Sequence, residues 1–174
     1  EGDCDLIMQI GTAKYGIRDE QGNFSPQRAK ELSKVVKAFE IKLSQGAKPG
    51  KGGLLPASKV HEEIAAIRGI PVNQDSISPN RHKDINNIDE LLDKINHLRE
   101  LTGRPVGIKT AIGGWNFINE LCDSINRRGL QYAPDFLTID GGEGGSGAAP
   151  QSLMDHVSLP ISEALPRVID ALIQ

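Results

Sequence analysis

Residues 39–44 read Phe-Glu-Ile-Lys-Leu-Ser, and residues 45–53 continue as Gln-Gly-Ala-Lys-Pro-Gly-Lys-Gly-Gly. Polar and aliphatic side chains alternate in the first stretch, as they do in a β-strand, where successive side chains point to opposite faces of the sheet. Glu40, Lys42 and Ser44 therefore share one face, and Ile41 and Leu43 share the other. The sequence predicts a strand with one polar face, followed by a glycine-rich loop.

The same alternation recurs along the chain, for example at Gln9 and at Thr138 with Asp140. We expect strands at Asp5–Ile10, Phe39–Ser44, Gln74–Ser78, Pro105–Thr110 and Asp135–Asp140. Apolar residues spaced three and four apart predict helices over about residues 26–36, 59–68, 88–102, 117–128 and 162–172. Capping residues support the helix boundaries: Ser25-Pro26, Asn87 with Glu90, Gly69, Gly103 and Gly129.

Strand and helix alternate at roughly 30 residues, which is the βαβ unit of a parallel sheet. Two parallel architectures compete, a doubly wound flavodoxin-like sheet and part of a (β/α)8 barrel. A doubly wound sheet buries both faces, so its strands read as continuous apolar runs, whereas these strands keep one polar face. We therefore expect an α/β fold: a partial (β/α)8 TIM barrel of about five consecutive parallel βα units, with residues 1–174 as a single domain.

The composition bounds the class of protein. A formal net charge of −3 argues against nucleic acid as the main partner. No run of about 18 apolar residues is present, and no signal-peptide pattern follows Glu1, so we expect a piece of a longer protein that spans no membrane. Because it has only two cysteines, we expect it to be reduced and cytoplasmic. Cys4 and Cys122 make no disulfide framework, and the four histidines lack metal-ligand spacing, so we expect no metal site.

Two glycine-rich loops follow expected strands. Residues 45–53 contain four glycines together with Lys48 and Lys51, and this loop can bring backbone N–H groups and positive charge to a ligand. A flexible surface loop is the alternative. Residues 140–147 read Asp-Gly-Gly-Glu-Gly-Gly-Ser-Gly and match GxGxxG, but the segment leads to Ala-Ala-Pro150 instead of opening a helix. We expect this second loop to lie beside a flat or phosphorylated ligand.

Three charged or titratable residues outside these loops have two interpretations each. Lys109 ends an apolar strand, so it has either a functional task or an ion pair with Glu40 or Asp140. Arg68 ends a helix, where a cation is often simply solvated. His82 lies in a polar loop after an expected strand, so it either faces the site or lies at the surface, and we expect the surface.

Four segments, residues 40–53, 77–85, 106–109 and 140–150, together resemble the FMN-binding barrel domain of glutamate synthases. They are most similar to the stand-alone FMN-binding members of that family, which lack the amidotransferase domain. The resemblance covers essentially the whole chain. It implies an oxidoreductase that uses FMN to reduce 2-iminoglutarate, formed from 2-oxoglutarate and ammonia, to L-glutamate in nitrogen assimilation.

The resemblance also implies roles for nine residues, although it identifies no catalytic residue. Three are expected to bind the carboxylates of 2-oxoglutarate: Gln45, Lys48 and Arg68. Six are expected to lie against the flavin: Gln9, Lys109, Gly141, Gly142, Gly144 and Gly145. It implies ammonia or glutamine-derived ammonia as nitrogen source, and ferredoxin or a reductase subunit as electron donor.

The chain departs from the family pattern at three points. Leu54 stands where the large glutamate synthases have a further substrate-binding glutamine. Neither Cys4 nor Cys122 matches the family's iron–sulfur cysteines, so any cluster belongs to the parent protein. The strands that carry the FMN phosphate site would follow Gln174, so we expect the isolated chain to be inactive, to bind FMN weakly, and to self-associate through unpaired strand edges. There are two alternatives. The first is another FMN-dependent barrel enzyme, such as an isomerase or a 2-hydroxy-acid oxidase. The second is a truncated, non-catalytic module that binds no flavin.

Overall fold

A computed structural model describes residues 4–154 and 156–173, and its centre is a four-stranded parallel sheet. The strands lie in the order β1-β2-β5-β6. The register pairs Gln9 with Glu40, Lys42 with Lys109, and Ala111 with Asp140. The strand bounds are Ile7–Ile10 for β1, Ala38–Lys42 for β2, Val106–Ala111 for β5 and Leu137–Asp140 for β6.

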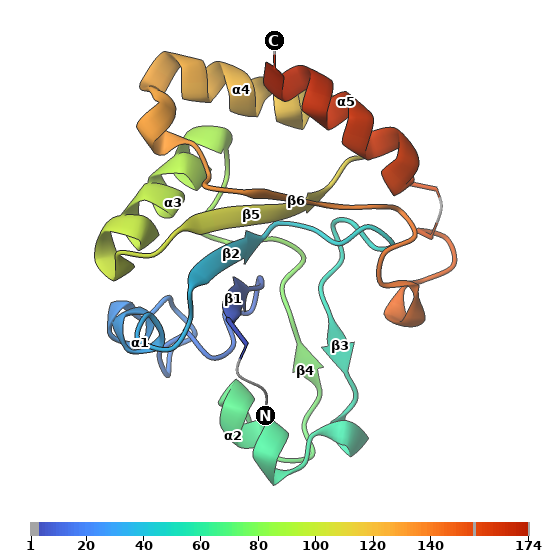
Figure 1. Cartoon of the computed structure of the whole chain (residues 1–174). Helices are drawn as coiled ribbons and strands as arrows, with labels where there is room; N and C mark the ends of the chain where they lie inside the picture. The colour runs from blue at the N-terminus through green and yellow to red at the C-terminus, as the bar shows by residue number, and fades with distance from the viewer. Residues whose placement is uncertain (1–3, 155, 174) are drawn as a thin grey trace.

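One face of the sheet carries the helices that connect or follow the strands (Figure 1). They are α1 (Pro26–Leu32), α3 (Ile88–Thr102), α4 (Asn116–Arg128) and α5 (Ile161–Ile173). The parallel strands are neighbours in chain order, with no reversal of the kind that defines a doubly wound sheet. The expected α/β class is therefore confirmed, and the arrangement is that of part of a barrel whose described strands form an open sheet.

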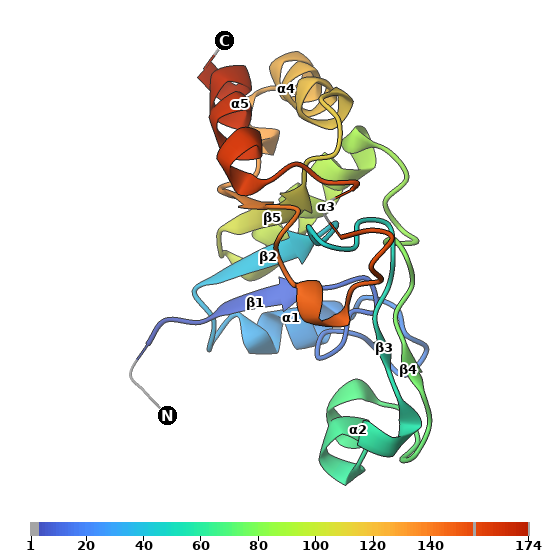
Figure 2. The ribbon, with the colours of Figure 1, turned by 90° about the vertical axis from the view of Figure 1, so that its right-hand side faces the viewer.

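The third expected strand is not in this sheet. Residues 54–77 form an arm that projects from the sheet (Figures 1 and 2). It contains β3 (Leu54–Leu55), a 3-10 turn η1 (Ala57–Lys59), α2 (Glu62–Arg68) and β4 (Ser76–Ile77). Because β4 pairs antiparallel with β3, the prediction of a parallel strand at Gln74–Ser78 is wrong. The residues that the structure describes form four parallel βα units, and the arm is inserted between β2 and α3.

The helix ends follow from capping residues. The Ser25 hydroxyl accepts the N–H of Arg28, and the Asn87 side chain accepts the N–H of Glu90. α1 ends earlier than expected, and Val36 is buried in the turn that follows. α5 begins at Ile161 and continues through Pro166, which lacks one intrahelical hydrogen bond. None of the described helices is long and apolar enough to cross a bilayer.

The main hydrophobic core fills the space between the sheet and the helices. Aliphatic residues of β1, β2 and β5 meet the apolar faces of α1, α3 and α4 there. The fully or nearly buried members are Ile10, Ile17, Ala29, Val36, Phe39, Ile41, Leu91, Leu92, Ile95, Leu98, Val106, Ile108, Leu121 and Ile125. The alternation of the strands therefore leaves the opposite face of the sheet to polar side chains, as expected.

Candidate functional site

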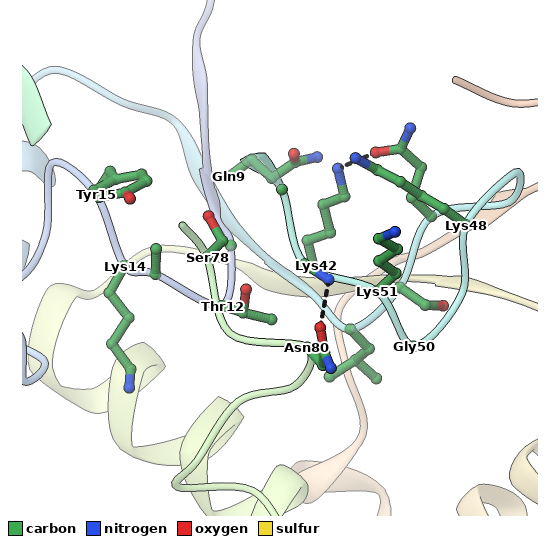
Figure 3. A pocket seen from close by; sticks show the side chains of 17 residues that line it. Gln9, Thr12, Lys14, Tyr15, Lys42, Lys48, Gly50, Lys51, Ser78 and Asn80 are labelled. Carbon is green, nitrogen blue, oxygen red and sulfur yellow. Dashed lines mark hydrogen bonds between the residues drawn. The ribbon is translucent and has the colours of Figure 1, made fainter. Parts of the chain in front are cut away.

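A cavity of about 260 Å³ lies at the carboxyl ends of β1 and β2. Three segments line it: residues 9–15 from the end of β1 and its loop, residues 42–53 from the end of β2 and its loop, and Ser78 with Asn80 from the segment after β4 (Figure 3). The Gly52 N–H donates to the Asn80 side chain at 2.9 Å, which joins two of these segments. In a barrel enzyme the active site lies at this end of the strands.

The lining is strongly cationic. It contains Lys14, Lys42, Lys48 and Lys51, and no aspartate or glutamate. Lys14 is neutralised by Asp84, 2.9 Å away. Within residues 4–154 and 156–173, the other three lysines form no ion pair with a carboxylate, although such pairs are common elsewhere in the fold. This excess of positive charge fits a cavity that binds an anion.

Lys42 lies close to two other lysines, Lys109 and Lys48. Burial lowers the pKa of Lys42, and the charge of neighbouring Lys109 lowers it further, against an opposing effect of Asp140. The Lys42 ammonium donates to Gln45 Oε1 at 2.8 Å. A bound anion would stabilise the charged form of this lysine.

Gln45 and Lys48, expected to bind substrate, and Gln9, expected to lie near the flavin, all line the cavity. Figure 3 shows the side chains of Gln9, Lys42 and Lys48 extending into the same region. Glu40 orients the Gln9 side chain, because Gln9 Nε2 donates to Glu40 Oε1 at 2.7 Å. Glu40 also accepts the Thr138 hydroxyl at 2.5 Å. Since a carboxylate only accepts, Glu40 fixes which way the Gln9 amide points.

The two glycine-rich loops pack against each other. The Gly46 N–H donates to Asp140 Oδ2 at 2.7 Å, and the Ala47 N–H donates to the Gly144 carbonyl at 3.0 Å. A Cβ at Gly46 would overlap the Gly141 carbonyl oxygen. The Gln45 Nε2 donates to the Gly145 carbonyl at 3.2 Å. Glycine is thus required here for backbone packing between the loops, which sets the position of Gln45.

The four glycines expected to lie against the flavin are not in the cavity wall. A Cβ at Gly141 would come within 2.7 Å of the Ile161 nitrogen, and one at Gly142 within 2.6 Å of the Ser158 carbonyl oxygen. One at Gly144 would meet Asp140, and one at Gly145 would overlap Gln45. Packing explains why these residues are glycine, and their role toward a flavin stays a prediction.

Lys109 lies outside the cavity wall, next to Lys42 across the β2–β5 pair. Its ammonium is 3.5 Å from Asp140 Oδ1, so Asp140 is its ion-pair partner, as one of the two interpretations predicted.

Arg68 also lies outside the wall, on the arm. It donates to Ser76 Oγ at 2.8 Å, and its guanidinium is 4.9 Å from the ring centroid of Tyr15, which does line the cavity. Leu54 is 62% exposed on β3 and contributes nothing to the cavity.

Sequence reasoning missed several residues of the site. Lys14, Tyr15 and Thr12 lie in the loop after β1, which carries no repeat or charge pattern. His82 was expected at the surface, and this is wrong, because it is 4% exposed and its Nε2 is 2.9 Å from the Lys42 carbonyl oxygen. Burial lowers the pKa of His82, so the ring is neutral near pH 7 and its Nε2–H donates to that carbonyl. His82 thereby supports the strand end that carries Lys42.

Asp84 fastens the loop after β1 to α3, since it accepts from Lys14 and Lys94 at 2.9 Å each. Partial burial alone would raise the pKa of Asp84, but the hydrogen bonds from Lys94 and Lys14 outweigh it and hold that pKa well below its usual range. Such a carboxylate stabilises the fold above its unfolded pKa of about 4, and the contribution is lost as pH falls.

We therefore expect Asp84→Asn to reduce the free energy of unfolding by about 1 kcal/mol at pH 7, since both pairs are partly exposed and screened. The difference from wild type should shrink as the pH falls below about 4, because the unfolded chain then binds a proton at Asp84 that the folded protein does not bind. Urea unfolding of wild type and variant at pH 7 and below about pH 4 measures this difference in the free energy of unfolding. Asp123→Asn is the control, as Asp123 forms no ion pair within the described residues. A pH-independent effect of Asp84→Asn would contradict the assignment.

Known proteins are similar to this chain over nearly its whole length. A family model described as "Conserved region in glutamate synthase" matches residues 1–174. The glutamate synthase large subunit-like protein YerD of Bacillus subtilis (strain 168) is 43% identical over 176 aligned positions, covering 100% of this chain and 33% of YerD. The archaeal glutamate synthase (NADPH) of Methanocaldococcus jannaschii is 38% identical over 166 positions, 94% of this chain and 29% of that protein.

A longer relative aligns too. The glutamate synthase (NADPH) large chain of Bacillus subtilis (strain 168) is 30% identical over 156 positions, 88% of this chain and 9% of that protein. The chain belongs to the glutamate synthase family, which is a family of oxidoreductases. It spans about a third of the length of YerD and of the archaeal relative.

Proposed function

We propose that this chain is the 2-oxo-acid-binding part of a glutamate synthase-type oxidoreductase that reduces 2-iminoglutarate, formed from 2-oxoglutarate and ammonia, to L-glutamate. One observation carries the proposal: the cavity at the strand ends contains three lysines without a carboxylate partner in the described residues and has no acidic residue in its wall. A dicarboxylate would bring two negative charges into this lysine-lined cavity. The family to which the chain belongs agrees with this substrate class.

Lys48 and Gln45 are proposed to bind one carboxylate. Gln45 Nε2 donates one N–H to Gly145, and an amide nitrogen has a second N–H for a ligand. The ammonium of Lys48 adds a charge-assisted hydrogen bond. Arg68, beside the cavity wall at Tyr15, is proposed to attract the second carboxylate.

FMN fits the polar face of the sheet next to the cavity. The pyrimidine edge of a flavin offers carbonyl and nitrogen acceptors and becomes negative on reduction, which suits the donors Gln9 and Lys109. Gln9 is oriented by Glu40, and Lys109 by Asp140. We propose that these residues hold the flavin edge, whose chemistry when bound is hydride transfer. A cavity of about 260 Å³ suits a small substrate better than a whole nucleotide.

An iron–sulfur cluster does not fit the described part of this chain. No group of three His, Cys, Asp or Glu side chains there could hold a metal ion, and Cys4 and Cys122 are free thiols. The electron donor, ferredoxin or a reductase subunit, is proposed to deliver its electrons to a part of the full-length protein outside this chain.

We also propose that copies of this protein associate with one another and that it works in the cytoplasm. Ile7, 57% exposed on the edge strand β1, fits an association surface.

The test uses the protein at its full natural length, loaded with FMN and chemically reduced. Addition of 2-oxoglutarate and isotopically labelled ammonium should reoxidise it in a single turnover and place the label in L-glutamate. Formation of 2-hydroxyglutarate without any need for ammonia would instead identify a 2-hydroxy-acid enzyme. Absence of both products would refute the proposed reaction.

A further inference from the structure

Tyr15 connects the cavity wall to the arm. It lines the cavity, and its hydroxyl shares a 2.7 Å hydrogen bond with Ser76 Oγ, which is 1% exposed. Ser76 Oγ also accepts the N–H of Arg68 at 2.8 Å. The guanidinium of Arg68 lies over the Tyr15 ring, 4.9 Å from its centroid. One buried hydroxyl and one aromatic ring thus define where this guanidinium lies.

Arg18 makes the same cluster more positive. Its guanidinium lies 4.7 Å from the Tyr15 centroid, and its Nη2 donates to the Arg68 carbonyl at 2.6 Å. This hydrogen bond fixes the carboxyl end of α2, and with it the point from which the Arg68 side chain starts. Within residues 4–154 and 156–173, neither arginine forms an ion pair with a carboxylate.

Two guanidinium groups beside one ring repel each other. The negative face of an aromatic ring offsets part of that repulsion, and an anion in the adjoining cavity would offset more. The positive charge of this cluster therefore favours an anion bound in the adjoining cavity. It lies at the arm side of the wall, while Lys48 and Gln45 belong to the loop after β2.

We propose that Tyr15 is a positioning residue that holds Arg68 beside the cavity wall and thereby makes the site prefer 2-oxo dicarboxylates to 2-oxo monocarboxylates. This inference rests on the proposed function. Arg68 meets the carboxylate distant from the oxo group, and Tyr15 acts through Arg68 without a contact of its own to the reacting atoms.

The test compares 2-oxoglutarate with 2-oxopentanoate, which has a methyl group in place of the distal carboxylate. In calorimetric titrations of the full-length protein, Tyr15→Leu should weaken 2-oxoglutarate about 10-fold and leave 2-oxopentanoate nearly unchanged, because the guanidinium loses its aromatic support. Tyr15→Phe keeps the ring and should stay within about 3-fold of wild type. Tyr132→Leu is the matched control, since Arg128 lies over the Tyr132 ring 4.2 Å from its centroid, in a pair that is not part of the cavity.

Ser76→Ala keeps the inference testable if Tyr15→Leu does not fold, because it removes the hydrogen bond to Arg68 and should lower the same preference. Equal loss of both ligands in these variants, or an unchanged preference, would overturn the role of Tyr15. A wild-type protein without preference for 2-oxoglutarate would instead refute the proposed function. Loss of affinity in Lys48→Ala alone, with the Tyr15 and Ser76 variants unaffected, would sustain the proposed function and reject this inference.

Discussion

Gly46→Ala is expected to weaken 2-oxoglutarate binding about 100-fold or more, the largest effect of any single methyl group in this site. The added Cβ would overlap the Gly141 carbonyl oxygen and come close to the Gly142 nitrogen. Backbone atoms cannot rotate away, so the two glycine-rich loops must separate. Their separation would break the hydrogen bonds of Gly46 to Asp140 and Ala47 to Gly144, and move Gln45 and Lys48.

Gly147→Ala is the matched control for this substitution. Gly147 belongs to the second glycine-rich loop, but a Cβ there meets no atom within 4 Å. It should bind 2-oxoglutarate like wild type, and thermal unfolding of both variants separates loss of the site from loss of the fold. Unchanged affinity in Gly46→Ala would show that the packing of the two loops does not form the substrate site.

Lys48→Ala is expected to weaken 2-oxoglutarate roughly 10- to 150-fold, because loss of a charge-assisted contact leaves a carboxylate unpaired at a cost of about 1.5–3 kcal/mol. FMN content and the flavin spectrum should stay unchanged, since Lys48 lies in the loop and not on the strand face. Lys59→Ala removes an exposed lysine of the arm and is the control for net charge. Equal affinities for wild type and Lys48→Ala would remove Lys48 from the site.

The polar face of the sheet could be predicted from the sequence because alternation is a local property of each strand. Glu40 and Lys42 were placed on one face by their spacing, and the register confirms it by pairing them with Gln9 and Lys109. The capping residues Asn87 and Gly103 likewise predicted the bounds of α3. These features depend on residues close together in the chain.

The arm could not be predicted in this way. Residues 74–78 contain one aliphatic residue, Ile77, which is 70% exposed, so their alternation reflects a short antiparallel ribbon and not a strand of the core. The pairing of Leu54 with Ile77 depends on a turn and a helix between them. The spacing of residues in the sequence does not show that the chain folds back here to pair β4 with β3.

The site was only partly predictable for a related reason. Gln45 and Lys48 stand in a loop whose composition marks it, whereas Tyr15 and Lys14 matter because of partners far along the chain, Ser76 and Asp84. The glycines at 141–145 were visible in the sequence, but their packing against Gln45, Asp140 and Ser158 became evident only in three dimensions.

The central claim is that the uncompensated lysines of the cavity bind a 2-oxo dicarboxylate, and one titration tests it most directly. Calorimetry of the wild-type, full-length protein with 2-oxoglutarate and with 2-oxopentanoate, at low and high salt, compares ligands that differ by one carboxylate. We predict at least about 10-fold tighter binding of 2-oxoglutarate, a preference that falls as salt screens the charges. Equal affinities for the two ligands, unaffected by salt, would contradict the account.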